Sequence, residues 1–167
     1  MPATPISILP ISDRPDLIPL ITDWLWTAFW QDLGQDRAQT RDYVASGVSA
    51  SGPPQTFVLL VDGSPVGTAT LAVHDLAERP DLTPWLADVF VLPEARGFGY
   101  VGHLMDAVET ACRDAGIATL WLYTHTAERI YAKRGWETVA YFERGGQTNA
   151  LMRRDLLPEA ECREAES

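Results

Sequence analysis

The chain has 167 residues, a hydrophobic fraction of 46% and a formal net charge of −10, which suits one globular domain that closes its own core. The acidic balance argues against a nucleic-acid partner, because contacts to phosphate need clustered Lys and Arg. It mildly favours cationic small molecules or basic peptides as partners, or it serves only to keep the chain in solution. No apolar run reaches the ~18 residues that span a bilayer, so no membrane partner is expected.

The N-terminal stretch MPATPISILPISDRP has neither a basic segment nor a long apolar segment, so it is unlike a secretory signal. Cys112 and Cys162 show no metal or redox spacing, which favours two free thiols over a disulfide. We therefore expect a cytoplasmic protein without a metal site.

Strands and helices are mixed along the chain, which predicts the α/β class. Turn residues and apolar periodicity predict strands at 6–9, 56–61, 65–73, 85–92, 119–123, 137–143 and 148–156, and helices at 16–30, 36–45, 99–115 and 126–134. Asp62-Gly63 predicts a hairpin turn between the second and third strands. Gly116 is expected to end the third helix. We expect one domain at 1–157 and a polar tail at 158–167.

A glycine-rich stretch, ARGFGYVG from Ala95 to Gly102, lies where a buried strand gives way to a helix. Free N–H groups and the dipole at a helix N-terminus attract phosphate, and glycines let the backbone come close to it. Gly97, Gly99 and Gly102 thus predict a pyrophosphate cradle to which Arg96 adds charge. A tight turn without a ligand is the alternative. The stretch lacks the Lys-Ser/Thr pair of a P-loop and lies too late for a dinucleotide fingerprint.

Two motifs resemble the GNAT superfamily of acyl-CoA-dependent N-acetyltransferases. The stretch FVLPEARGFGYV resembles the lead-in and the central Arg/Gln-x-x-Gly-x-Gly/Ala motif of the family, with matches at Arg96, Gly99 and Val101. The stretch TAERIYAKRGW resembles its Ala-x-x-x-Tyr-x-x-x-Gly-Phe element, with matches at Ala127, Tyr131, Gly135 and Trp136. The resemblance covers about 57–156 well and implies a single-domain fold with a twisted, mostly antiparallel mixed sheet and flanking helices.

The resemblance also implies acetyl-CoA as cosubstrate. The pantetheine arm is expected to pair with backbone groups of Val89, Phe90 and Val91, as an added strand would. The cradle is expected to involve the whole run of Arg96, Gly97, Phe98, Gly99, Tyr100, Val101 and Gly102.

Two residues depart from the family pattern. Val101 stands where Gly or Ala is usual, and its side chain could crowd the phosphates. Thr124 stands where the family often has an Asn that contacts the cofactor, so that contact is expected to survive in weaker form.

Tyr131 matches the general acid of the family, which protonates the leaving thiolate; a buried core tyrosine is the alternative. Asp88 lies inside the apolar run WLADVFVL, where a carboxylate needs a partner. It is the candidate to bind the substrate ammonium or to relay its proton, and a purely structural carboxylate is the alternative. His74 and His125 are further candidates near the substrate, either as bases or as loop residues.

Two tryptophans, Trp26 and Trp30, lie four residues apart on the predicted first helix, opposite an apolar stripe that runs from Leu17 to Ala28. Exposed tryptophans on one patch usually meet a partner. We expect them to line a groove for an aromatic or cationic amine. Packing against the second helix, or a homodimer contact, is the alternative.

These features together predict an N-acetyltransferase that moves an acetyl group from acetyl-CoA to a primary amine of a small molecule, peptide or protein, by direct attack in a ternary complex. A non-catalytic acyl-CoA-binding sensor or scaffold is the alternative.

Overall fold

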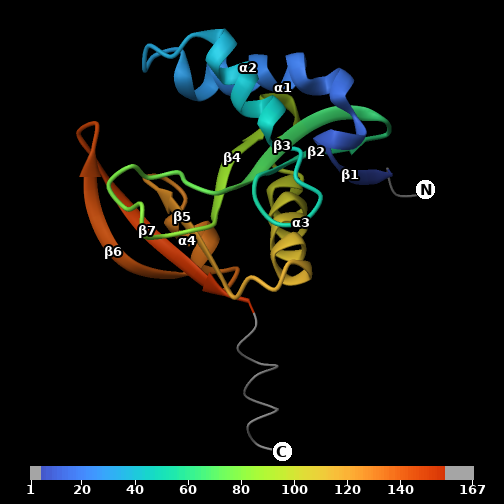
Figure 1. Cartoon of the computed structure of the whole chain (residues 1–167). Helices are drawn as coiled ribbons and strands as arrows, with labels where there is room; N and C mark the ends of the chain where they lie inside the picture. The colour runs from blue at the N-terminus through green and yellow to red at the C-terminus, as the bar shows by residue number, and fades with distance from the viewer. Residues whose placement is uncertain (1–4, 157–167) are drawn as a thin grey trace, which may run out of the picture.

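The computed structural model describes residues 5–156 (Figure 1). Its strands and α-helices are β1 (Ile6–Pro10), α1 (Ile18–Leu25), α2 (Arg37–Ser46), β2 (Gln55–Val61), β3 (Ser64–Ala72), β4 (Trp85–Val91), α3 (Tyr100–Asp114), β5 (Thr119–Thr124), α4 (Glu128–Ala132), β6 (Glu137–Arg144) and β7 (Gln147–Asp155). The expected tail and Cys162 lie outside these residues. Cys112 is a free, buried thiol. No helix within 5–156 is long and apolar enough to cross a bilayer.

The strands form one seven-stranded mixed sheet in the order β1-β2-β3-β4-β5-β7-β6. Every neighbouring pair is antiparallel except β4 and β5, so the expected mostly antiparallel sheet is confirmed. β4 and β5 share a single paired position, Trp85 with Trp121. Beyond it the two strands separate, with β4 running toward α1 and α2 while β5 stays beside β7 (Figure 1).

The two faces of the sheet carry separate hydrophobic cores, because successive side chains of a strand point to opposite faces. Phe57 and Leu59 of β2 belong to the core that α3 closes with Leu104, Met105 and Val108. Val58 and Leu60 belong to the core that α1 and α2 close with Ile21, Leu25 and Val44. This double burial makes TFVLLV a nearly continuous apolar run and fixes α3 and the α1–α2 pair on opposite faces.

The predicted helix at 16–30 is helical throughout but not uniformly so. A 3-10 turn (Pro15–Leu17) precedes α1, and a π-helix (Trp26–Trp30) follows it. The wider π turn changes the direction of side chains after Leu25, and Ala28 is exposed. Our placement of Ala28 on the buried stripe was therefore wrong, because it assumed 3.6 residues per turn to the end of the helix.

Candidate active site

Asp88 occupies a β-bulge in β4. Thr68 pairs with Phe90 and Thr70 pairs with Ala87, so two residues of β4 stand opposite one residue of β3. Asp88 has a φ of 57°, a left-handed conformation that is uncommon outside glycine. The hydroxyl of Tyr43, on α2, donates a hydrogen bond to Oδ2 of Asp88 at 2.5 Å. The bulge thus presents the only carboxylate of β4 to the helical layer above it.

The surroundings of Asp88 poise it for proton transfer. Burial raises its pKa to about 6, while the hydrogen bond from Tyr43 and, to a smaller extent, the nearby hydroxyl of Thr70 oppose the rise. Because hydrogen bonds to the charged form favour it, the Tyr43 hydroxyl holds the pKa below the value that burial alone would give. A carboxylate with a pKa near neutrality is a better base than an ordinary aspartate and is still largely ionised at pH 7.

A second carboxylate, Asp75, lies in the loop after β3. Its pKa is raised to about 7 by burial and by the negative charge of Asp88, against the lowering effect of Arg144. The pKa of Tyr43 is also raised, first by burial and then by Asp88 and Asp75, so its hydroxyl stays protonated. Two coupled carboxylates and a neutral phenol therefore share one region of the site.

A cavity of about 330 Å³ opens beside this group. Its lining combines aromatic, acidic and apolar side chains from the first helical segment, α2 and the loop after β3: Trp30, Gln35, Tyr43, His74, Asp75, Leu76 and Ala77. A second hollow of about 200 Å³ is lined by Tyr43, Thr70 and His74 among others. Acidic oxygens beside aromatic faces suit a cationic ligand.

Only some of the residues predicted to bind substrate meet at this cavity. Trp30 and His74 line it, and Trp30 packs edge-on against Tyr43 with ring centroids 5.3 Å apart. Trp26 instead donates its indole N–H to the carbonyl of Gln35 at 2.8 Å, which holds the start of the π-helix against the loop before α2. His125 is an exposed residue after β5.

The glycine-rich loop has the geometry of an anion cradle. Gly97 and Gly99 have φ values of 89° and 80°, and no atom lies within 4 Å of where their Cβ atoms would be. The backbone before the first turn of α3 is therefore open to a ligand. Arg96 lies back on β4, where its Nε donates to the carbonyl of Val91 at 2.9 Å and its guanidinium covers the ring of Phe90.

Phe98 and Val101 point to different environments. Phe98 is exposed and stacks on Tyr100, with ring centroids 5.7 Å apart. Val101, which we expected to crowd the phosphates, packs against the core beneath α3. That packing favours an open cradle.

Gly102 also makes room for a side chain from outside the glycine run. A Cβ on Gly102 would meet the guanidinium of Arg134, with atoms at 2.9 to 3.1 Å. The missing side chain therefore leaves room for Arg134 against the first turn of α3.

β4 and β5 pair only at Trp85 and Trp121, so the later residues of β4 have no partner strand on the β5 side. Val91 is buried, while Val89 and Phe90 are partly buried along the strand that leaves β5. Thr124 ends β5, and its hydroxyl accepts hydrogen bonds from the backbone N–H groups of Thr126 and Ala127, at 3.3 and 3.0 Å. These bonds hold the chain at the start of α4.

Tyr131 lies on α4, half-buried, with its ring edge-on to that of Trp136 at 6.0 Å between centroids. Burial raises the pKa of its hydroxyl, so the phenol is protonated at neutral pH and able to donate a proton.

Comparison with known proteins shows which family this chain belongs to. The family model described as "Acetyltransferase (GNAT) family" matches residues 18–136. The chain therefore belongs to the GNAT acetyltransferase family and is an acyl-CoA-dependent N-acetyltransferase. A search of curated protein sequences found no significant match.

Solved structures share this fold over nearly the whole chain. A GNAT acetyltransferase from Streptococcus pneumoniae superposes with a TM-score of 0.70 at 15% identity, over 91% of this chain and 99% of the other. An aminoglycoside 6'-N-acetyltransferase complexed with coenzyme A gives 0.70 at 14% identity, over 92% and 98%. N-acetylglutamate synthase from Neisseria gonorrhoeae, complexed with coenzyme A and N-acetyl-glutamate, gives 0.66 at 21% identity, over 93% of this chain and 36% of the other.

Sequence reasoning missed Tyr43 and Arg134 altogether and gave Asp75 no role. Tyr43 is 45 residues from Asp88 along the chain, and no local pattern connects the two. The one available signal for Arg134 was its place next to Gly135, at the end of the Tyr131 motif.

Proposed function

We propose that this acetyltransferase moves the acetyl group of acetyl-CoA to a primary amine that enters through the cavity beside Trp30, Tyr43 and Asp75. The observation that carries the proposal is the bulge, which puts the Asp88 carboxylate next to Tyr43, on the strand that leads into the glycine loop. An amine enters as an ammonium ion, and the carboxylates of Asp75 and Asp88 favour it over neutral or anionic ligands.

Acetyl-CoA supplies the activated acetyl group as a thioester when it is bound. Gly97, Gly99 and the first N–H groups of α3 would hold its pyrophosphate, and Val89 to Val91 would pair with its pantetheine arm. The open space at both glycines fits this use.

In the proposed step the ammonium gives one proton to Asp88, and the freed nitrogen attacks the carbonyl carbon. The N–C bond forms, the C–S bond breaks, and the hydroxyl of Tyr131 gives its proton to the departing sulfur. The nitrogen loses a second proton as the amide forms, and Tyr131 is reprotonated. The products are the amide, free thiol and one proton, which leaves through Asp88.

The test is release of free thiol from acetyl-CoA in the presence of a panel of primary amines, together with calorimetric binding of acetyl-CoA. Asp88→Asn and Tyr131→Phe should each lower kcat by about a hundredfold while acetyl-CoA binding persists. Asp81→Asn and Tyr141→Phe, which change exposed residues, serve as matched controls and should retain the wild-type rate. Binding without thiol release on any amine would contradict the proposal.

A further inference from the structure

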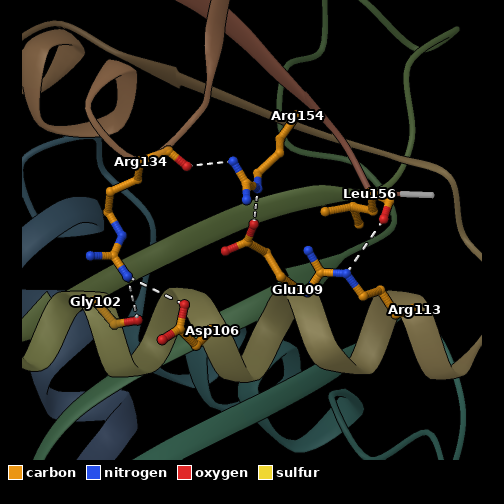
Figure 2. A network of polar contacts seen from close by, with 7 residues as sticks. All are labelled: Gly102, Asp106, Glu109, Arg113, Arg134, Arg154 and Leu156. Atoms are coloured by element: carbon orange, nitrogen blue, oxygen red, sulfur yellow. Dashed lines mark hydrogen bonds and ion pairs between the residues drawn. The ribbon is translucent and has the colours of Figure 1, made fainter. Parts of the chain in front are cut away.

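Arg134 lies across the first turn of α3, although it follows α4 in the sequence (Figure 2). One guanidinium nitrogen is 3.3 Å from the carbonyl oxygen of Gly102 and 3.3 Å from Oδ1 of Asp106. Gly102 is the third residue of a helix that begins at Tyr100. The positive charge is therefore within one turn of the free N–H groups at the end of the glycine loop.

The backbone at Arg134 is fixed independently of its side chain. Its carbonyl accepts a hydrogen bond from Arg154, which also forms an ion pair with the buried carboxylate of Glu109 on α3 (Figure 2). Gly135 follows with a φ of 95°, and a Cβ there would meet the Arg154 guanidinium. Arg154 thus anchors the residue that carries the exposed guanidinium, so little ordering is needed on binding.

The guanidinium keeps donors free for a ligand. Its two contacts in the structure come from one nitrogen, whereas an arginine carries five N–H donors. Its partner Asp106 is 68% exposed, and the Arg134 side chain is 38% exposed. An exposed pair of this kind contributes little stability. The Arg134 guanidinium can therefore contact a ligand at little cost to the fold.

The surrounding charge also points to an anion. The chain carries 13 basic and 23 acidic residues, so a ligand with several phosphate charges needs local cations. The short segment from Arg129 to Arg134 contains three of them, Arg129, Lys133 and Arg134.

We infer that Arg134 binds the ribose 3'-phosphate of coenzyme A and makes this enzyme select coenzyme A over dephospho-coenzyme A. The inference rests on the proposed use of acetyl-CoA. Coenzyme A carries a pyrophosphate and a separate 3'-phosphate. The glycine loop takes the pyrophosphate at Gly97 and Gly99 in the proposed function, whereas Arg134, which follows α4, contacts α3 at Gly102 and Asp106, after those two glycines. The phosphate that it meets is therefore the second one.

The test is calorimetric binding of coenzyme A and of dephospho-coenzyme A, which lacks only the 3'-phosphate. The wild-type protein should bind coenzyme A about tenfold more tightly, the effect of one charge-assisted contact. Arg134→Gln should remove this preference by weakening coenzyme A binding alone, and Arg134→Lys should restore part of it. Arg153→Gln, which removes an arginine paired with Glu137 on β6, is the matched control and should keep the preference.

Asp106→Asn gives an independent test with the opposite sign. Removing this carboxylate frees the guanidinium and takes a negative charge from the site, so coenzyme A should bind several-fold more tightly, and dephospho-coenzyme A, which keeps only the pyrophosphate, should gain less. A structural role for the Arg134–Asp106 pair predicts a loss instead.

The outcomes separate the two proposals. If neither ligand binds the wild-type protein, the use of acetyl-CoA fails. If both bind but Arg134→Gln weakens both equally, or neither, the assignment of the 3'-phosphate to Arg134 is overturned while the proposed function stands.

Discussion

Tyr43 is the residue that connects the acceptor cavity to the candidate base. Its ring forms part of the cavity wall with Trp30, and its hydroxyl donates to Asp88. Because the phenol stays protonated and its hydrogen bond is stronger to the ionised form of Asp88, it lowers the pKa of the carboxylate without taking its proton. Tyr43 is therefore a positioning residue, and it has no proton-transfer role in the proposed step.

We predict that Tyr43→Phe moves the acid limb of the pH profile of kcat/KM to higher pH by roughly one unit, because a hydrogen bond to the charged form is lost. The limb should lie near pH 6 in the wild-type protein, where Asp88 has a pKa of about 6. Activity at pH 6 should fall several-fold and recover at pH 8. Tyr141→Phe should leave the limb in place.

An unchanged limb in Tyr43→Phe, with kcat lowered equally at all pH values, would contradict the tuning role. Asp75 titrates in the same range, at about 7, so the profile reports the carboxylate pair rather than one residue. The shift caused by Tyr43→Phe is still diagnostic, since its hydroxyl contacts only Asp88 of the two.

At the scale of elements, local patterns predicted most of the fold. Asp62 and Gly63 have φ values of 52° and 80° and join β2 to β3 as expected from Asp-Gly. Gly116, at a φ of 74°, follows the end of α3. The short helix predicted at 126–134 is only Glu128–Ala132, because the Thr124 hydroxyl caps the preceding turn and a tight turn at Gly135 ends it.

Local sequence patterns could not predict the acceptor side of the site. A period of two along WLADVFVL cannot reveal that a bulge at Asp88 turns its side chain toward α2. The π-helix at Trp26–Trp30 likewise broke the periodicity that grouped Trp26 with Trp30. Family motifs supplied the cradle and Tyr131, whereas tertiary packing alone brought Tyr43, Asp75 and Asp88 together.

The ion pair between Glu109 of α3 and Arg154 of β7 joins two elements and also holds the turn after α4 (Figure 2). Burial raises the pKa of Glu109, and Arg154 opposes the rise. We predict that Arg154→Met destabilises the fold by about 3 kcal/mol, because it leaves a buried carboxylate without its partner. Urea unfolding measures the change.

The double variant Arg154→Met, Glu109→Leu should regain most of that loss, since well-packed apolar groups often replace a buried pair at little cost. A double variant that is as unstable as Arg154→Met would show that the contact of Arg154 with the Arg134 carbonyl matters more than the ion pair.

At the scale of the whole molecule, burying the Asp75 carboxylate in the acceptor site lowers the stability of the folded protein. Asp75 has a pKa of about 7 in the folded protein, against an ordinary value of 3.8. Below pH 3.8 both folded and unfolded chains hold the proton, so Asp75 contributes nothing. Between 3.8 and 7 the unfolded chain loses the proton first, and stability falls as pH rises. Above 7 the penalty is complete and constant.

We predict that Asp75→Asn stabilises the protein at pH 8 and not at pH 4, because the amide removes the cost of burying a charge. The gain should be about 2 kcal/mol, roughly half of what the pKa difference implies, since the side chain is partly open to water. Urea unfolding at the two pH values measures it. Asp81→Asn, at an exposed residue whose pKa is lowered by Arg79, should give no gain at either pH.

The same Asp75→Asn variant should bind cationic amines more weakly, because one of the two carboxylates that attract them is gone. Equal stabilisation by Asp75→Asn at both pH values would mean that packing, and not the buried charge, sets the cost in stability of this site.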